Sequence, residues 1–168
     1  DADRTITANY QLEWWVELDT DPIGLALLYD GVPVATPQRL WCAAGSTHLL
    51  EAPSPNGAGP DVRYAFDRWI DTSVENPRTH PCNGAARYTA VYHAEFRLTL
   101  DTSPTGLTVV RDGVNLAAPA TTWCPDLSIH TIGVPSPQFL GGDRYEFSSW
   151  FDGGAQSHPV MCLAPATI

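Results

Sequence analysis

The sequence lacks lysine altogether. Its nine basic residues are all arginine and face 19 Asp and Glu, giving a formal net charge of -10. A phosphate-binding surface needs clustered cations, so this balance argues against nucleic acid and anionic membranes as partners. Without a lysine amine there is no Lys-Asn isopeptide crosslink, so covalent reinforcement has to come from cysteine.

Long apolar runs and helical periodicity are also absent. No apolar run reaches the roughly 18 residues of a membrane helix, and we expect no membrane insertion. No signal-peptide pattern follows Asp1, so we expect any targeting segment to have been removed. Fifteen Pro and 13 Gly punctuate the chain at strand-length intervals. This pattern predicts an all-β fold of small β-sandwich (Ig-like) modules with six or seven short strands each.

A long alternating segment at residues 88–100 is the most informative stretch. Every second side chain from Tyr88 to Leu100 is apolar, which is the period of a strand with one buried face. Its span of about 43 Å is roughly twice that of a usual strand. We therefore expect one strand that serves two neighbouring packing units.

The same pattern occurs at residues 6–18, 82 residues earlier, so the chain is a tandem repeat. A period of this length indicates two small domains joined by a long shared strand. We expect a closing strand at residues 1–13, a first module at 14–94 and a second module at 95–168. Each copy also carries an Asp-Gly pair between apolar runs, a strong hairpin signal, at Asp30-Gly31 and Asp112-Gly113.

The four cysteines obey the repeat. Cys42 and Cys124 each follow a Trp, and Cys82 and Cys162 fall near the end of each copy. We expect disulfides from Cys42 to Cys82 and from Cys124 to Cys162, each worth about 4 kcal/mol in the chain-entropy model. Zinc is the alternative, but the chain has no C-x-x-C. Disulfides predict an extracellular location, secreted or at the cell surface, or the cytosol of a hyperthermophile.

Candidate sites for chemistry are few. His48 and His130 are equivalent, and His80 and His158 each precede the second cysteine of their copy; structural roles outweigh metal binding for all four. We expect no cofactor. Calcium would suit the acidic turns at Asp19, Asp21 and Asp101, where Asp is also typical of turn capping. No Gly-x-Ser-x-Gly motif appears, so the sequence predicts no enzyme and no catalytic residue.

Six tryptophans are present. Four recur by copy and are expected in the core: Trp41, Trp69, Trp123 and Trp150. Alternation places Trp15 on the polar face of its segment, where the second copy has Arg97. Trp15 is therefore the expected exposed aromatic contact with a glycan or another subunit.

Several motifs recur in both copies: Leu-Asp-Thr-x-Pro-x-Gly-Leu, Asp-Gly-Val, Trp-Cys, Ala/Val-Pro-Ser-Pro and Arg-Tyr-x-Phe-x-x-Trp. With Asp-Gly-Gly-Ala-Gln-Ser-His at 152–158 and Tyr-Thr-Ala-x-Tyr at 88–92, they resemble a bacterial extracellular repeat, the divergent internalin-B-repeat-like domain. The resemblance spans nearly all of residues 6–168 and implies a non-enzymatic spacer, adhesive or scaffold role. The chain departs from that pattern by its cysteines and by residues 71–79, which lack the Asp-Gly-Gly turn.

The phase of the repeat suggests how copies associate. The second copy closes at 162–168, where we expect its last strand to be missing, while residues 6–12 form a closing strand with no module before it. Strand addition between subunits would resolve both, and a head-to-tail contact propagates into a filament. We expect an interface strand whose inward-facing residues are Ile6, Ala8, Tyr10, Leu12 and Trp14. The alternatives are a fragment of a longer array and a carbohydrate-binding or adhesive accessory module.

Overall fold

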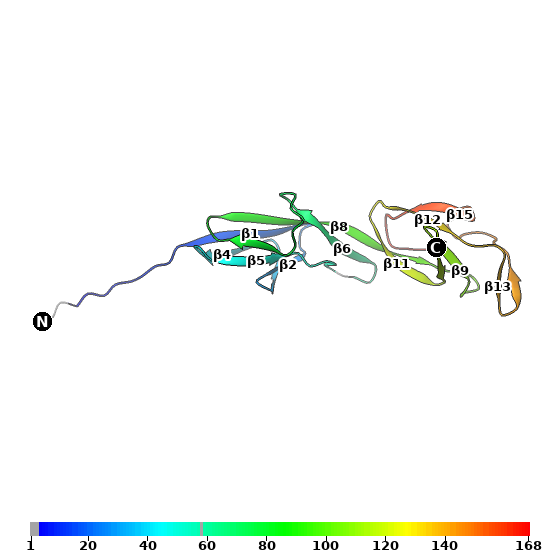
Figure 1. The fold of residues 1–168 in the computed structure, drawn as a ribbon, viewed down its shortest axis with the longest axis horizontal. Coiled ribbons are helices and arrows are strands. Elements are labelled where there is room, and N and C mark those ends of the chain that lie inside the picture. The colour runs from blue at the N-terminus through cyan, green and yellow to red at the C-terminus, as the bar shows by residue number, and fades with distance from the viewer. Residues whose placement is uncertain (1–3, 58) are drawn as a thin grey trace. The chain divides into compact units, whose positions relative to one another are not determined.

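The computed structural model describes residues 4–57 and 59–168. Within them the protein is all-β, as expected: no residue is helical, and 16 strands form four sheets, none of them closed (Figure 1). No helix capable of crossing a membrane occurs in these ranges. The chain divides into two compact units, which we call unit 1 (4–57 and 65–92) and unit 2 (59–64 and 93–168).

Unit 1 is built on two sheets. In one sheet β1 pairs with β4 and with the first part of β8, which also pairs with β6. The second sheet has the order β3-β2-β5-β7. The strands are β1 (Glu13–Asp21), β2 (Ala26–Tyr29), β3 (Val32–Ala35), β4 (Gln38–Ala43), β5 (Thr47–Glu51), β6 (Val62–Trp69), β7 (Arg78–Pro81) and β8 (Ala86–Leu100).

Unit 2 repeats this plan in part. The last part of β8 pairs with β11 and with β16, and the second sheet has the order β10-β9-β12-β15. A separate hairpin is formed by β13 and β14. The strands are β9 (Thr108–Arg111), β10 (Val114–Ala117), β11 (Ala120–Pro125), β12 (Ile129–Gly133), β13 (Gln138–Leu140), β14 (Asp143–Tyr145), β15 (Ser157–Met161) and β16 (Ala166–Thr167).

The alternating segment at 88–100 lies within β8, a single strand of 15 residues that contributes to both units. Its apolar positions Ala90, Tyr92, Leu98 and Leu100 are buried, as the alternation predicts. In unit 2, Leu98 and Leu100 join a core that also includes Val109 and Ile132 from the facing sheet. The core of each unit therefore gathers side chains from both of its sheets.

Local signals in the sequence form as expected. Asp30 and Gly31 have φ of 51° and 77°, and Asp112 and Gly113 have φ of 50° and 81°, the left-handed conformations that a two-residue hairpin turn requires. Cys42 is bonded to Cys82 and Cys124 to Cys162, with Cα–Cα distances of 6.1 and 6.2 Å. Each disulfide links the two sheets of its unit, and two disulfides indicate an oxidising, extracellular environment.

Two expectations about the chain ends are wrong. Residues 6–18 do not form one strand: β1 begins at Glu13, and residues 4–12 belong to no strand. Alternation produces a strand only where a partner strand satisfies the backbone, and 13–21 find β4 and β8 while 6–12 find none. The closing strand of unit 2 is also not wholly missing, because β16 pairs Ala166 with Leu98 and Thr167 with Thr99.

Candidate functional site: a groove in unit 2

Unit 2 has a groove of about 510 Å³ with a mixed apolar and polar lining. It lies beside the turn that follows β8, beside β13 and beside the segment that follows β14. The residues that line it include Leu107, Gln138, Phe147, Trp150 and Ile168. Trp150 also belongs to the unit 2 core, and Gln138 contributes a side-chain amide to the lining.

The matching place in unit 1 is filled by the protein itself. The repeat aligns Gln138 with Asn56, Phe147 with Phe66 and Trp150 with Trp69. Against these residues of unit 1 lie the tyrosines of β8. The ring of Tyr92 meets Phe66 edge to face at 5.9 Å, and Tyr88 meets Trp69 in the same way at 6.2 Å. Tyr92 is only 6% exposed, so its ring fills the place in unit 1 that corresponds to the groove of unit 2.

A hydrogen bond holds the Tyr92 ring in place in unit 1. The Nδ2 of Asn56 donates to the hydroxyl of Tyr92 at 3.0 Å and to the carbonyl of Ala26 at 2.7 Å. Burial is the larger influence on Tyr92 and raises the pKa of its hydroxyl. Asn56 is buried beneath the ring, whereas Gln138 in unit 2 is only half-buried.

The backbone shows the same difference. In unit 1, residues 86–91 of β8 pair in parallel with residues 16–21 of β1, and on the other side the amide of Ile70 donates to the carbonyl of Thr89. In unit 2, β8 pairs in parallel with only two residues of β16, and the amide of Asp101 donates to Ile168. Ile168, the residue that follows β16, also lines the groove.

The expected interface strand lies outside any sheet. Ile6, Tyr10 and Leu12 are 83%, 95% and 60% exposed, and Ala8 is also exposed. The carbonyl of Leu12 accepts a hydrogen bond from the amide of Ala44, which marks the start of unit 1 proper. Trp14 is different, because it is half-buried in β1 opposite Cys42. Of the five expected interface residues, four are exposed and Trp14 belongs to the unit 1 sheet.

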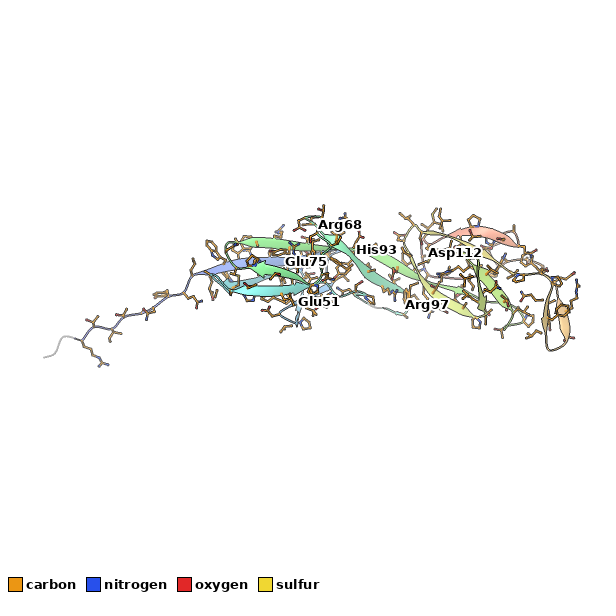
Figure 2. All side chains as sticks on the ribbon, in the orientation of Figure 1. Glu51, Arg68, Glu75, His93, Arg97 and Asp112 are labelled. Carbon is orange, nitrogen blue, oxygen red and sulfur yellow. A yellow bond between two sulfur atoms is a disulfide. The ribbon has the colours of Figure 1, made fainter. Side chains whose placement is uncertain are left out.

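Trp15 is not the exposed aromatic that its position predicted. It is half-buried, and the guanidinium of Arg39 lies over its ring at 4.6 Å while also pairing with Glu17 at 2.8 Å. Its counterpart Arg97 (labelled in Figure 2) pairs with Asp61 at 2.7 Å. The tryptophan open to solvent on this strand pair is Trp41, which is 62% exposed although the repeat placed it in the core.

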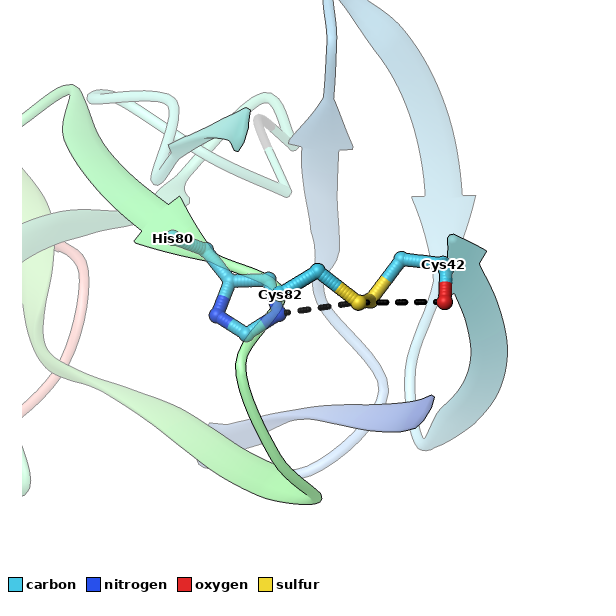
Figure 3. A group of neighbouring side chains, drawn as sticks. All are labelled: Cys42, His80 and Cys82. Atoms are coloured by element: carbon cyan, nitrogen blue, oxygen red, sulfur yellow. Dashed lines mark hydrogen bonds between the residues drawn. A yellow bond between two sulfur atoms is a disulfide. The ribbon is translucent and has the colours of Figure 1, made fainter. Parts of the chain in front are cut away.

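One cluster of potential metal ligands lies in the part of the chain that the structure describes. It consists of Cys42, Cys82 and His80, with ligand atoms within 4.8 Å of one another (Figure 3). The two sulfurs are bonded to each other, so they are not thiolates and cannot ligate a metal in this state. His80 packs against the disulfide, 3.7 Å from Cys42 Sγ, and its Nδ1 lies 3.0 Å from the Tyr88 hydroxyl. Burial, aided by the charges of His48 and Arg78, lowers the pKa of His80.

A Ser-His-Asp arrangement occurs in each unit. Nδ1 of His130 lies 2.8 Å from Asp112 (labelled in Figure 2), and Nε2 lies 3.1 Å from Ser128 Oγ. The single hydroxyl hydrogen of Ser128 goes to the carbonyl of Pro125 at 2.6 Å, so the serine is not oriented to give its proton to the histidine. The hydrogen bond from His130, with that from the Thr131 amide, lowers the pKa of Asp112. We interpret the cluster as a brace on the hairpin turn.

The same brace occurs in unit 1. His48 bridges Asp30 at 2.7 Å and Ser46 at 2.7 Å, and Ser46 donates to the carbonyl of Ala43. His80 and His158, in contrast, are not equivalent. The residue of unit 1 that matches His158 is Arg78. Arg78 lies over the ring of Trp69, and His158 meets the ring of the equivalent Trp150.

The aspartates considered for calcium take part in turns. Asp19 accepts from the amide of Thr20 at 2.8 Å, and Asp101 accepts from the amide of Thr102 at 2.7 Å. Asp21 ends β1 at an exposed position. Local capping of this kind is the common role of Asp before a turn.

Comparison of the chain with protein-family models, with curated proteins and with solved structures found no match. The groove residues Gln138, Phe147, Trp150 and Ile168 were not predicted as a site from the sequence. The repeat does contain a signal for them, because their counterparts surround Tyr88 and Tyr92 in unit 1.

Proposed function

We propose that the protein is a non-enzymatic extracellular structural protein whose copies assemble head to tail. In this proposal each unit is an immunoglobulin-like β-sandwich, and the N-terminal segment of one subunit fills the unit 2 groove of the next. The resemblance to the internalin-B-repeat-like domain, with its spacer or scaffold role, supports the same class of function.

The observation that carries the proposal is the contrast between a filled and an open groove. Unit 1 packs Tyr92 against Phe66 and Tyr88 against Trp69. Unit 2 has the matching Phe147 and Trp150, and the protein has a second segment of the same pattern with Tyr10 almost fully exposed. Burying each large apolar side chain of such a segment stabilises the complex by roughly 1.5 to 3 kcal/mol, and main-chain hydrogen bonds add to this.

Head-to-tail contacts of this kind use two different surfaces, so they generate open filaments unless the rotation between subunits closes a ring. The absence of lysine and the acidic charge concern only solubility and partner choice. The two disulfides, one per unit, fit a protein that works outside the cell.

The test is a deletion of residues 1–11, which leaves the hydrogen bond between Leu12 and Ala44 intact. Purified protein with intact disulfides is examined at rising concentration by sedimentation and by negative-stain imaging. We expect the full chain to form linear polymers and the deleted chain to stay monomeric, with unfolding unchanged in dilute solution because the exposed part of this segment contributes no core. If the deleted chain polymerises as well as the full chain, donation of this segment is wrong.

A glycan-binding accessory role is the second candidate. The observation that favours it is the exposed ring of Trp41 beside Trp15 on neighbouring strands. A glycan array would test it with Trp41→Ala, and with Trp123→Ala at the matching position of unit 2 as control. Binding that is absent, or that survives Trp41→Ala, would remove this role.

A further inference from the structure

The strand pairing of unit 2 fixes where a donated segment can enter. Ala166 pairs with Leu98 and Thr167 with Thr99, just as Ala86 pairs with Val16 and Arg87 with Glu17 in unit 1. Ile168 therefore holds the position of Tyr88. Its side chain packs against the unit 2 core, and its backbone is bonded at both ends, to Thr99 and to Asp101.

Occupation by Ile168 excludes Ile6. The repeat aligns Ile6 with Tyr88, so a donor placed by the repeat alone would require two isoleucines in one place. The next position of the repeat after that of Ile168 corresponds to Thr89, and the donor residue aligned with it is Thr7. Thr5-Ile6 duplicates Thr167-Ile168, so these residues bring nothing that the acceptor lacks.

Resting on the proposed assembly, we propose that residues 7–11 of one subunit follow Ile168 of the next subunit as one composite strand, with Ala8 and Tyr10 facing the core and the Tyr10 hydroxyl bound by Gln138. The joined sequence is Ala-Thr-Ile followed by Thr-Ala-Asn-Tyr-Gln, against Ala-Arg-Tyr-Thr-Ala-Val-Tyr-His at 86–93. Thr7, Ala8 and Tyr10 are identical to the residues that they replace.

The inward positions agree in size. Ala90 is 0% exposed in unit 1, so the position that Ala8 takes admits a methyl group and little more. Tyr10 takes the position of Tyr92, where its ring meets Phe147 as Tyr92 meets Phe66. Asn9 replaces Val91 on the opposite face, where Val91 is only partly buried.

The hydrogen-bond count identifies Gln138 as the partner of Tyr10. In unit 1 the two hydrogens of Asn56 Nδ2 go to Ala26 and to Tyr92. Gln138 makes the equivalent bond from Nε2 to the carbonyl of Thr108 at 3.0 Å, and its Oε1 accepts from the Thr108 amide at 2.7 Å. The second Nε2 hydrogen corresponds to the one that holds the Tyr92 hydroxyl.

The donor stretch stops at Gln11. The carbonyl of Leu12 accepts from Ala44 of its own subunit, in the way that the carbonyl of Ala94 accepts from Asp126 in unit 2. The composite strand would thus pass from acceptor to donor at the same point of the repeat at which β8 passes from unit 1 to unit 2.

Fluorescent peptides test the register. The acceptor is the full chain carrying Tyr10→Ala, which keeps its groove but is a poor donor. We expect a peptide of residues 7–13 to bind as tightly as one of residues 4–13, because residues 4–6 have no place. Ala8→Leu in the peptide should abolish binding, and Asn9→Ser, on the opposite face, should leave it unchanged.

The Tyr10 contact is tested by a double-mutant cycle. Tyr10→Phe in the peptide and Gln138→Ala in the acceptor should each weaken binding about fivefold, and the pair together no more than either alone. Deleting residues 166–168 from the acceptor should create a preference, so that the peptide of 4–13 binds more tightly than that of 7–13.

The outcomes separate this inference from the proposed function. If the peptide of 4–13 binds the intact acceptor and that of 7–13 does not, the donor displaces β16: the composite strand is wrong, and head-to-tail donation stands. If the Tyr10→Phe and Gln138→Ala effects add, the hydrogen bond is wrong. If neither peptide binds, both the register and the proposed function are overturned.

Discussion

The pattern Arg-Tyr-x-Phe-x-x-Trp forms different structures in the two units. At 63–69 it lies in β6, a strand of eight residues that ends at Trp69. At 144–150 it gives β14, a strand of three residues, after which Glu146–Trp150 belong to no strand. The sequence motif is the same, but β6 has β8 as a neighbour and the residues after β14 have none among the described strands. A strand here depends on its partner more than on its own pattern.

The N-terminal segment teaches the same lesson. Residues 6–12 alternate as regularly as residues 88–94, yet only the latter lie in a sheet. Hydrogen bonds across a sheet need two strands, and an unpartnered one leaves its amides and carbonyls to water. The proposed assembly joins two regions that lack a strand partner in the described residues: the N-terminal segment at 6–12 and the groove of unit 2.

The largest expected effect follows from removing the Tyr92 ring from unit 1. Tyr92→Ala should destabilise unit 1 by about 3 to 5 kcal/mol, because it opens a cavity against Phe66 and removes one of the two hydrogen-bond acceptors of Asn56. Tyr10→Ala should change dilute unfolding by less than about 0.5 kcal/mol, since this side chain is exposed, while abolishing polymers. Urea unfolding followed by tryptophan fluorescence measures both. Equal losses for the two variants would mean that Tyr10 is buried in the monomer.

Removing the disulfides compares the two units directly. The closed loops are nearly equal, with separations of 40 and 38 residues, so each loss should cost a similar amount, about 2 to 4 kcal/mol. Unit 2 starts with an open groove where unit 1 has the buried ring of Tyr92. We expect Cys124→Ala with Cys162→Ala to unfold it first on heating, and Cys42→Ala with Cys82→Ala to leave unit 2 as it was.

A peptide of residues 4–13 supplies the control for the disulfide variants. A ligand that binds only the folded groove stabilises it in proportion to the logarithm of its concentration. The peptide should therefore raise the melting temperature of unit 2, with or without its disulfide, and leave unit 1 unchanged. A higher melting temperature of unit 1 alone would mean that the peptide binds to unit 1, against the proposal.

Much of the fold was predictable because the chain repeats. Alternation predicted β8, the Asp-Gly pairs predicted the hairpins, and the spacing of four cysteines predicted both disulfides. Pattern alone could not predict where β1 begins or that β16 forms, because these depend on which backbone has a partner. Trp15 was misplaced because alternation gives the face of a strand but not the arginine that covers it from the neighbouring strand.

The smallest expected difference between the units concerns pH. His80 is 1% exposed beside the disulfide of unit 1, facing Tyr88, His48 and Arg78, whereas the matching residue of unit 2 is Val160. Burial lowers the pKa of His80 in the folded state, so the unfolded chain takes up this proton first. The contribution of neutral His80 to the free energy of unfolding of unit 1 is therefore complete above about pH 6.5. It is lost as the pH falls from there toward the folded-state pKa.

His80→Val should therefore flatten the pH dependence of unit 1 stability below about pH 6.5. The change in slope is at most one proton's worth, about 1.4 kcal/mol per pH unit. Loss of the bond to the Tyr88 hydroxyl should lower stability by a constant amount at every pH, which leaves the slope unaffected. Urea unfolding from pH 7.5 to 5 compares the variant with the parent, and parallel curves would show that His80 titrates normally in the folded protein.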